Sequence, residues 1–302
     1  MSKSILFFTD THLAADPLGQ RLGDYGRDLL EKIAWVAEQA RGYDVVCFGG
    51  DLVNAPGVSL RVVNEAVRLL REMAAPVALV FGQHDLVGHS PTTITHSAAS
   101  LAYWALKNHP GTLPERVMEV GGLQMRLLSH RLGTDQCITE GRYHDMVDVA
   151  VVHALVGYSL PVDQVKVGAA VVLTGDYHQG YEPRRVGDTW FFNPGALSRK
   201  TIDDYERVPQ VAVLQYDEKR MTVEAWEYLP VPCRPAAAIF DLGSHIERKT
   251  GEAQQSEYIK MLSQATVTEQ YTVEEMLDSL DVEGPVREYV ERQLQEADQR
   301  EK

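Results

Sequence analysis

The sequence predicts an α/β fold of four layers, an αββα sandwich in which two mixed sheets pack face to face with helices outside. Short apolar runs near the N-terminus alternate with segments of helical spacing, which is typical of βαβ units on a largely parallel sheet. Each of these runs ends in a polar cluster. The later part of the chain is richer in strand-like segments, which predicts a second sheet.

The first three strands are expected at residues 5–8, 45–48 and 77–81. Apolar residues recur at helical spacing between these strands, which predicts helices within 29–37 and 62–70. Six further strands and one hairpin turn are expected at 124–128, 147–152, 169–173, 189–192, 210–216 and 221–226, with the turn at 217–219.

The character of the sequence changes after residue 228, where prolines at 230, 232 and 235 mark a boundary. We therefore expect a core over residues 1–228, a capping segment or linker over 229–250, and a C-terminal helical region over 251–302. Within the last two parts we expect one strand and three helices, at 236–242, 256–264, 272–280 and 285–300.

The composition limits the classes of function. A net charge of −14 argues against a simple electrostatic nucleic-acid binder, and residues 245–302 alone carry 14 acidic against 7 basic side chains. No apolar run approaches the roughly 20 residues that cross a bilayer, so no membrane partner is expected. The three cysteines form no C-x-x-C pair, which favours a reducing, cytoplasmic location.

Polar clusters follow five of the expected strands. Ligands of open α/β sheets collect at the carboxyl ends of the strands, so we expect these side chains to converge. Carboxylates and imidazoles that converge in this way form di-metal centres, in which Asp51 is placed to bridge two cations. His84, followed by Asp85, is the expected general acid, held and tuned by that carboxylate. The clusters consist of Asp10, His12, Asp51, Gln83, His84, Asp85, His153, Asp176 and His178.

The ordered motifs D-x-H, G-D, G-x-H-D, a strand-terminal histidine and G-x-x-H resemble those of the calcineurin-like metallophosphoesterase superfamily, over roughly residues 5–226. The resemblance implies two metal sites that share one carboxylate, and contact between His84 and the scissile phosphate. One metal would be held by Asp10, His12, Asp51 and His178. The other metal would be held by Asp51, Gln83, His153 and Asp176.

Two positions depart from the family pattern. Gln83 stands where the family has asparagine, and Asp176 stands where it has the first histidine of G-H-x-H. The extra carboxylate makes the site harder, which favours two Mn²⁺ ions, with Mg²⁺ as the alternative. The same changes also fit a site drifting toward weak activity. His130 is the alternative to His153, because it too follows an apolar run.

Within the superfamily, the segments 153–157, 175–179 and 192–199 resemble the SbcD-type nuclease subunit of double-strand-break repair complexes, possibly in a phage-encoded form. This resemblance implies a metal-dependent DNA exo- and endonuclease that works with an SMC-like ATPase of the SbcC type, docked on the C-terminal helices. A homodimer is also compatible with those helices. The expected contacts to substrate phosphates are Asn54, Arg184, Arg185, Arg199 and Lys200.

Two other functions remain open from the sequence. The first is a stand-alone phosphodiesterase or phosphatase acting on a nucleotide or phosphoprotein, which would not need the C-terminal helices. The second is a degenerate member of the fold used as a binding scaffold, which Gln83 and Asp176 keep open. Failure to bind two metal ions would favour the scaffold.

Overall fold

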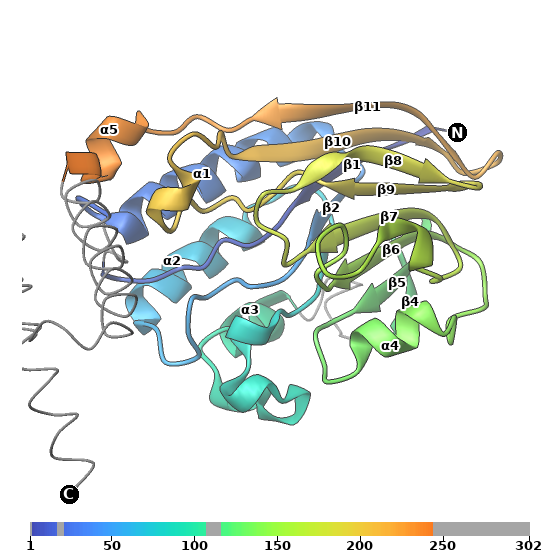
Figure 1. Ribbon diagram of the computed structural model, residues 1–302, viewed down its shortest axis with the longest axis horizontal. Helices are drawn as coiled ribbons and strands as arrows, with labels where there is room; N and C mark the ends of the chain where they lie inside the picture. Colours follow the sequence, from blue (N-terminus) through green and yellow to red (C-terminus); the bar gives the residue numbers. More distant parts are fainter. Residues whose placement is uncertain (1, 17–20, 107–115, 244–302) are drawn as a thin grey trace, which may run out of the picture. The chain divides into compact units, whose positions relative to one another are not determined.

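The computed structural model describes residues 2–16, 21–106 and 116–243, and two mixed sheets form its centre (Figure 1). In the first sheet β1, β2 and β3 run parallel, and β10 and β11 extend it antiparallel on the other side of β1. The order of its strands is β11 (Thr222–Pro230), β10 (Gln210–Asp217), β1 (Ser2–Phe8), β2 (Val45–Phe48) and β3 (Val77–Leu79).

The second sheet has a parallel centre and one antiparallel strand at each edge. Its strands follow the order β4 (Arg116–Val120), β5 (Leu123–Leu128), β6 (Val147–His153), β7 (Ala169–Gly175), β9 (Thr189–Asn193) and β8 (Tyr181–Val186). Parallel strands buried on both faces read as continuous apolar runs, which is how β6 and β7 read in the sequence.

The alternation of side chains along β1 builds two of the apolar layers. Ile5 and Phe7 belong to the cluster between the two sheets, whereas Leu6 and Phe8 belong to the cluster beneath the helices. Those helices are α1 (Tyr25–Gln39), α2 (Leu60–Arg71) and α3 (Ser100–Leu106). On the outer face of the second sheet a third cluster involves Ile138 of α4 (Thr134–Thr139). The predicted four-layered α/β sandwich is therefore confirmed, with a thin helical layer over the second sheet.

One predicted element is wrong. Residues 236–242 were expected as a strand, but Ala236–Ile239 form the short helix α5, and Phe240 makes an isolated bridge to Arg21. Three consecutive alanines have high helix propensity and no alternation of polar and apolar residues. The edge strands β4 and β8, and the helices α3 and α4, were not predicted.

A compact unit extends from the N-terminus to Asp241, and Val231 and Phe240 are buried within it. The helices expected at 256–264, 272–280 and 285–300, and with them the region 251–302, lie outside the described residues. Within the described part of the chain, no helix combines the length and apolar character needed to cross a membrane.

Candidate metal centre

The predicted ligand side chains lie at the carboxyl ends of strands in both sheets. Asp10 follows β1, Asp51 follows β2, and the short 3₁₀ helix Gln83–Asp85 follows β3. In the second sheet His153 is the last residue of β6, while Asp176 and His178 follow β7. Because these strands are parallel within each sheet, their ends meet at one edge of the sandwich.

The backbone at this edge is strained. Asp10, His12, Asp51 and Asp176 have φ angles of 54°, 44°, 54° and 83°, in the left-handed region that residues with a Cβ seldom adopt. The loops after β1 and β2 are joined by hydrogen bonds from the Asp10 N–H to the Gly50 carbonyl at 3.0 Å and from the His12 N–H to the Asp51 carbonyl at 2.9 Å. Strain of this kind clusters at functional sites, where the surrounding structure holds it in place.

The first group of converging atoms surrounds the Nε2 atoms of His12 and His178, which lie 2.9 Å apart. Asp10 Oδ1 lies 3.7 Å from each of them, and Asp51 Oδ2 lies 3.6 Å from His12 Nε2. Burial holds the pKa of His12 well below its usual value, although Asp51 acts in the opposite direction. His12 is therefore a neutral imidazole, which is the form that binds metal ions.

The second group surrounds His153, which is fully buried. Its Nε2 lies 2.8 Å from Gln83 Oε1, 3.5 Å from Asp51 Oδ2 and 3.9 Å from Asp176 Oδ1, and its Nδ1 lies 2.6 Å from the Gly49 carbonyl. Both ring nitrogens thus face oxygen atoms. Burial lowers the pKa of His153, but the Asp51 carboxylate and then Asp10 and Asp176 raise it well above its usual value.

The two groups share Asp51. Its Oδ1 accepts a hydrogen bond from the His84 N–H at 2.9 Å, whereas its Oδ2 is buried and has no hydrogen-bond partner among the described residues. That oxygen lies between the imidazoles of His12 and His153, as a carboxylate that bridges two cations requires. The set of carboxylate, amide and imidazole donors fits two divalent cations, and three groups of these side chains lie close enough together to hold a metal ion.

Neighbouring side chains fix the ligands in place. Thr9 Oγ1 donates a hydrogen bond to Asp10 Oδ2 at 2.6 Å, and the Asp176 N–H donates to the same oxygen at 3.0 Å. Gln83 Nε2 donates to Asp176 Oδ1 at 2.5 Å, so the two residues that depart from the family pattern contact each other. Such outer contacts orient metal ligands and set their basicity.

His84 lies half-buried beside the first group, with its ring centroid 4.8 Å from that of His12. Its Nδ1 lies 2.9 Å from the Asn54 carbonyl, which leaves Nε2 to face the cluster. The expectation that Asp85 holds His84 is wrong. Asp85 instead accepts hydrogen bonds from the N–H groups of Val53 and Gly82, both at 3.0 Å, because it caps the turn after β3. Burial and the neighbouring Asp51 raise the pKa of Asp85 to about 7.

Two of the residues expected to contact substrate lie close to the cluster. Lys200 is half-buried, and burial lowers the pKa of its amine while the nearby carboxylates of Asp51 and Asp10 act in the opposite direction. Asn54 is adjacent to His84, but its main-chain carbonyl makes the contact.

Arg199 was expected to contact substrate, and the structure contradicts this. Its side chain is buried, and its guanidinium donates to the main-chain carbonyls of Asp204, Tyr205 and Arg234. These bonds satisfy the donors that a substrate phosphate would need.

Arg184 and Arg185 also depart from the prediction, because they lie on β8 far from the strand ends. Arg185 pairs with Trp190, which in turn pairs with Val171 of β7. Val171 precedes Gly175, at the end of that strand, by four residues, or about 13 Å at the usual rise per residue. The sequence places both arginines after His178, but the hairpin carries them away from the cluster.

A cleft of about 480 Å³ opens beside the second group and includes Gln83 and Asp176 among its lining residues. His130, at the end of β5, and Leu155, after β6, also line it. The His130 ring lies 6.4 Å from the His153 ring, so the structure brings both histidines to this edge. Because β5 runs parallel to β6, His130 follows the carboxyl end of its strand as the other polar side chains of this edge do.

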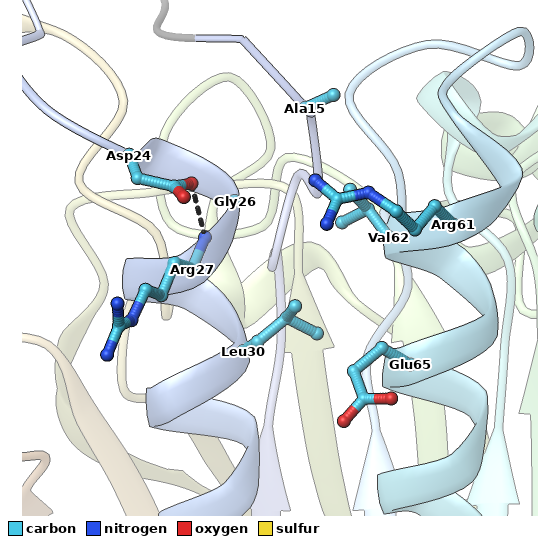
Figure 2. A pocket seen from close by; sticks show the side chains of 8 residues that line it. All are labelled: Ala15, Asp24, Gly26, Arg27, Leu30, Arg61, Val62 and Glu65. Atoms are coloured by element: carbon cyan, nitrogen blue, oxygen red, sulfur yellow. Dashed lines mark hydrogen bonds between the residues drawn. The ribbon is translucent and has the colours of Figure 1, made fainter.

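A second hollow, of about 420 Å³, lies between α1 and α2 and contains none of the predicted ligands (Figure 2). Asp24 caps α1 there by accepting a hydrogen bond from the Arg27 N–H at 2.9 Å, and Leu30 lies between the helices. Arg61 and Glu65 of α2 line its other side. We assign this hollow no part in the chemistry of the cluster.

A comparison with solved structures finds several matches of low sequence identity. The protein TT1561 of Thermus thermophilus has a TM-score of 0.47 and 15% identity, and the match covers 77% of this chain and 100% of that one. A novel phosphatase of Mycoplasma pneumoniae has a TM-score of 0.44 and 13% identity, over 79% of this chain and 96% of that one. Vacuolar Protein Sorting 29 of Cryptosporidium parvum has a TM-score of 0.35 and 14% identity, and the match covers 76% of this chain and 98% of that one.

No curated protein sequence matches this chain. The sequence profile of a protein family does match it, however, and that family is described as the calcineurin-like phosphoesterase superfamily domain. The match extends over residues 4–219, which is well over half of the chain and includes every strand-end ligand described above. The chain therefore belongs to the calcineurin-like phosphoesterase superfamily.

Proposed function

We propose that this chain is a two-metal phosphodiesterase that cleaves DNA, the SbcD-type subunit of a recombination or repair nuclease. The observation that carries the hydrolytic part is the unpaired Asp51 Oδ2, which lies 3.6 Å from His12 Nε2 and 3.5 Å from His153 Nε2. A buried carboxylate oxygen between two ligand groups is suited to bridging two cations.

The residues of the chain have distinct tasks in this proposal. Asp10, His12, Asp51 and His178 would hold one cation and Asp51, Gln83, His153 and Asp176 the other, which together would supply Lewis-acid chemistry and an activated water. Asp51 keeps the two ligand groups in register, because its other oxygen is fixed by the His84 N–H. The imidazolium form of His84 delivers a proton from Nε2 to the leaving oxygen, while the Asn54 carbonyl holds its Nδ1–H.

The segment 192–199, which resembles SbcD-type nucleases, hydrogen-bonds to the loops that carry Asp10 and His178. The Ser198 hydroxyl donates to the Asp10 carbonyl at 2.9 Å, and the Leu197 N–H donates to the Thr9 carbonyl at 2.9 Å. The Ala196 N–H donates to the His178 carbonyl, also at 2.9 Å. Lys200, directly after this segment, is the cation we expect beside a substrate phosphate.

The metals we propose are Mn²⁺ ions, because the second group contains two carboxylates and an amide oxygen beside a single imidazole. The proposed partner is an SMC-like ATPase of the SbcC type, which would supply the basic surface that a chain of net charge −14 lacks. Co-purification with such an ATPase, with and without residues 256–302, tests that partnership.

The deciding experiment is cleavage of end-labelled single- and double-stranded DNA in Mn²⁺ by the wild type, His84→Ala and Asp51→Ala. We expect losses of about 100-fold or more in both variants, the lower end of the contribution of a general acid. His144→Ala is the matched control, because His144 is exposed and lies outside the cluster. Equal cleavage by all four proteins would contradict the assignment. Cleavage of bis-p-nitrophenyl phosphate but not of DNA would indicate a stand-alone phosphodiesterase.

A binding scaffold is the second candidate, and one contact favours it. The Gln83 amide donates to Asp176 while its oxygen faces His153 Nε2, so three of the four side chains of the second group already hydrogen-bond one another. Calorimetric titration with Mn²⁺ separates the two functions. Two ions per chain support the enzyme, whereas no binding at millimolar Mn²⁺ supports the scaffold.

A further inference from the structure

Two tyrosines stack on each other beside the candidate metal centre. The rings of Tyr158 and Tyr177 have centroids 5.4 Å apart and planes inclined by 27°. Tyr177 lies in sequence between the ligands Asp176 and His178. Tyr158 is 72% exposed, so its ring is accessible from solvent.

The position of Tyr177 is fixed by its main chain. Its carbonyl accepts hydrogen bonds from Asn193 Nδ2 at 3.2 Å and from the Gly180 N–H at 3.0 Å. Asn193 is the last residue of β9, so the second sheet anchors the loop that carries the ring. The ring of Tyr177 therefore keeps its place relative to the two ligands on either side of it.

Tyr158 is presented by a tight turn. The Gly157 N–H donates to the Leu160 carbonyl at 2.8 Å, and the Leu160 N–H donates to the Leu155 carbonyl at 3.2 Å. Gly157 has a φ of 90°, and a Cβ there would lie 2.5 Å from the ring of Tyr181. Only glycine fits this position, and the two hydrogen bonds hold the turn that places Tyr158 against Tyr177.

The same turn joins the cleft beside the metal centre. Leu155, three residues before Tyr158, lines the cleft together with Gln83 and Asp176. The two stacked rings therefore lie on the loops that form this side of the candidate centre. A substrate whose phosphate reaches the cluster would extend its neighbouring group over one of these loops.

We propose that Tyr158 and Tyr177 form a stacking platform for a nucleobase next to the scissile phosphate. The substrate class is then a nucleic acid strand with at least one unpaired base at the cleavage position, such as single-stranded DNA or a frayed duplex end. Aromatic side chains stack bases of any sequence because every base offers a π face. This inference rests on the proposed nuclease function and specifies which form of DNA enters the site.

The test compares two end-labelled single-stranded oligonucleotides in Mn²⁺, one with normal bases and one with abasic residues around the cleaved bond. Tyr158→Ala should raise KM for the normal strand about 5-fold or more, the lower end of the effect of removing one stacked base. The same variant should leave kcat unchanged and should cleave the abasic strand as the wild type does. Tyr158→Phe should behave as the wild type on both strands.

Because Tyr158 is exposed, its replacement should not disturb folding, and Trp226→Ala serves as a control for loss of another exposed ring. Equal effects of Tyr158→Ala on the normal and the abasic strand, or no effect on either, would overturn the platform while leaving the nuclease in place. Failure of the wild type to cleave any oligonucleotide, with bis-p-nitrophenyl phosphate still hydrolysed, would overturn the nuclease and the platform together.

Discussion

Two buried clusters of ionisable side chains in the described part of the chain differ in how their charges are balanced. At the start of α1, Asp28 Oδ2 lies 2.8 Å from Arg21 Nη2 and 3.3 Å from Lys32 Nζ, and all three side chains are buried. In the candidate metal centre the carboxylates of Asp10 and Asp51 are buried as deeply, but mostly imidazoles and main-chain N–H groups face them. The first cluster contains its own cations, whereas the second is suited to cations from solution.

The pKa values of Asp28 and Asp10 differ accordingly, whereas Asp51 resembles Asp28, because His153 and His12 outweigh its burial and lower its pKa. Burial raises the pKa of Asp28, but Lys32 and Arg21 lower it by more, so it lies below the usual value of 3.8. For Asp10 burial prevails over His153 and His178, and its pKa is raised. The ionised form of Asp28 therefore stabilises the fold, whereas the ionised form of Asp10 opposes it. A buried charge that opposes folding is typical of a site kept for binding.

The largest change in the free energy of unfolding is expected from breaking the cluster of Arg21, Asp28 and Lys32. Asp28→Asn should lower the free energy of unfolding by about 3–5 kcal/mol, because it leaves Arg21 and Lys32 buried without a counter-ion. Urea denaturation followed by circular dichroism measures the change. Glu65→Gln is the control: it breaks an ion pair with Arg68 on the exposed face of α2 and should leave the midpoint unchanged. Equal midpoints for Asp28→Asn and the wild type would contradict the assignment.

The stability difference between the wild type and Asp28→Asn should depend on pH. The folded pKa of Asp28 lies below its unfolded value, so its contribution is fully present above about pH 4 and is lost as the pH falls through the folded pKa. The stability difference between wild type and Asp28→Asn should therefore be constant from pH 7 to about pH 5 and shrink below pH 4. A difference that persists unchanged at pH 2 would show that packing, not charge, stabilises this cluster.

The second cluster should respond to metal where the first does not. Mn²⁺ at about 100 times its dissociation constant should stabilise the wild type by about 2.7 kcal/mol for each ion bound, since only the folded state gathers the ligands. A thermal melt in Mn²⁺ and in chelator measures the shift. Asp28→Asn should show the same shift from a lower starting point, whereas Asp51→Asn should show almost none. An equal shift in Asp51→Asn would place the metal elsewhere.

The sequence could predict the strand ends of both sheets and the side chains that converge there because these signals are local. A buried run followed by a polar cluster places Asp10, Asp51 and His153 on the same edge once the strands are taken as parallel. The resemblance to the superfamily assigned the same residues to two metal sites. The departures from the expected pattern at Gln83 and Asp176 also read directly from the sequence, and the structure adds that the two side chains touch.

The remaining features depend on contacts that no sequence pattern records. Asp85 follows His84 directly, yet its carboxylate turns to the N–H groups of Val53 and Gly82. Arg199 is polar but buried, because main-chain carbonyls of neighbouring loops surround it. The position of Arg185 depends on the register of the β8–β9 hairpin. Alternation of polar and apolar residues does not define that register, because β8 is largely exposed.

The smallest change in the free energy of unfolding is expected from Asp10→Asn, and it should be an increase. Asp10→Asn removes a buried charge but keeps an oxygen that can accept from the Asp176 N–H, so in chelator the variant should be more stable than the wild type by about 0.5–2 kcal/mol. In Mn²⁺ the order should reverse, because the wild type alone gains the full stability from binding. Urea midpoints at pH 7 in both buffers measure the two differences.

A variant that is less stable than the wild type in chelator would contradict this sign. It would mean that the protonated His153 already balances Asp10 as fully as Lys32 and Arg21 balance Asp28. The two clusters would then differ only in the kind of cation they contain, and the gain from metal would come from exchanging a proton on His153 for a metal ion. Because the raised pKa of His153 favours its protonated form on either account, Mn²⁺ titration should release protons in both, and the order of the urea midpoints in chelator decides between them.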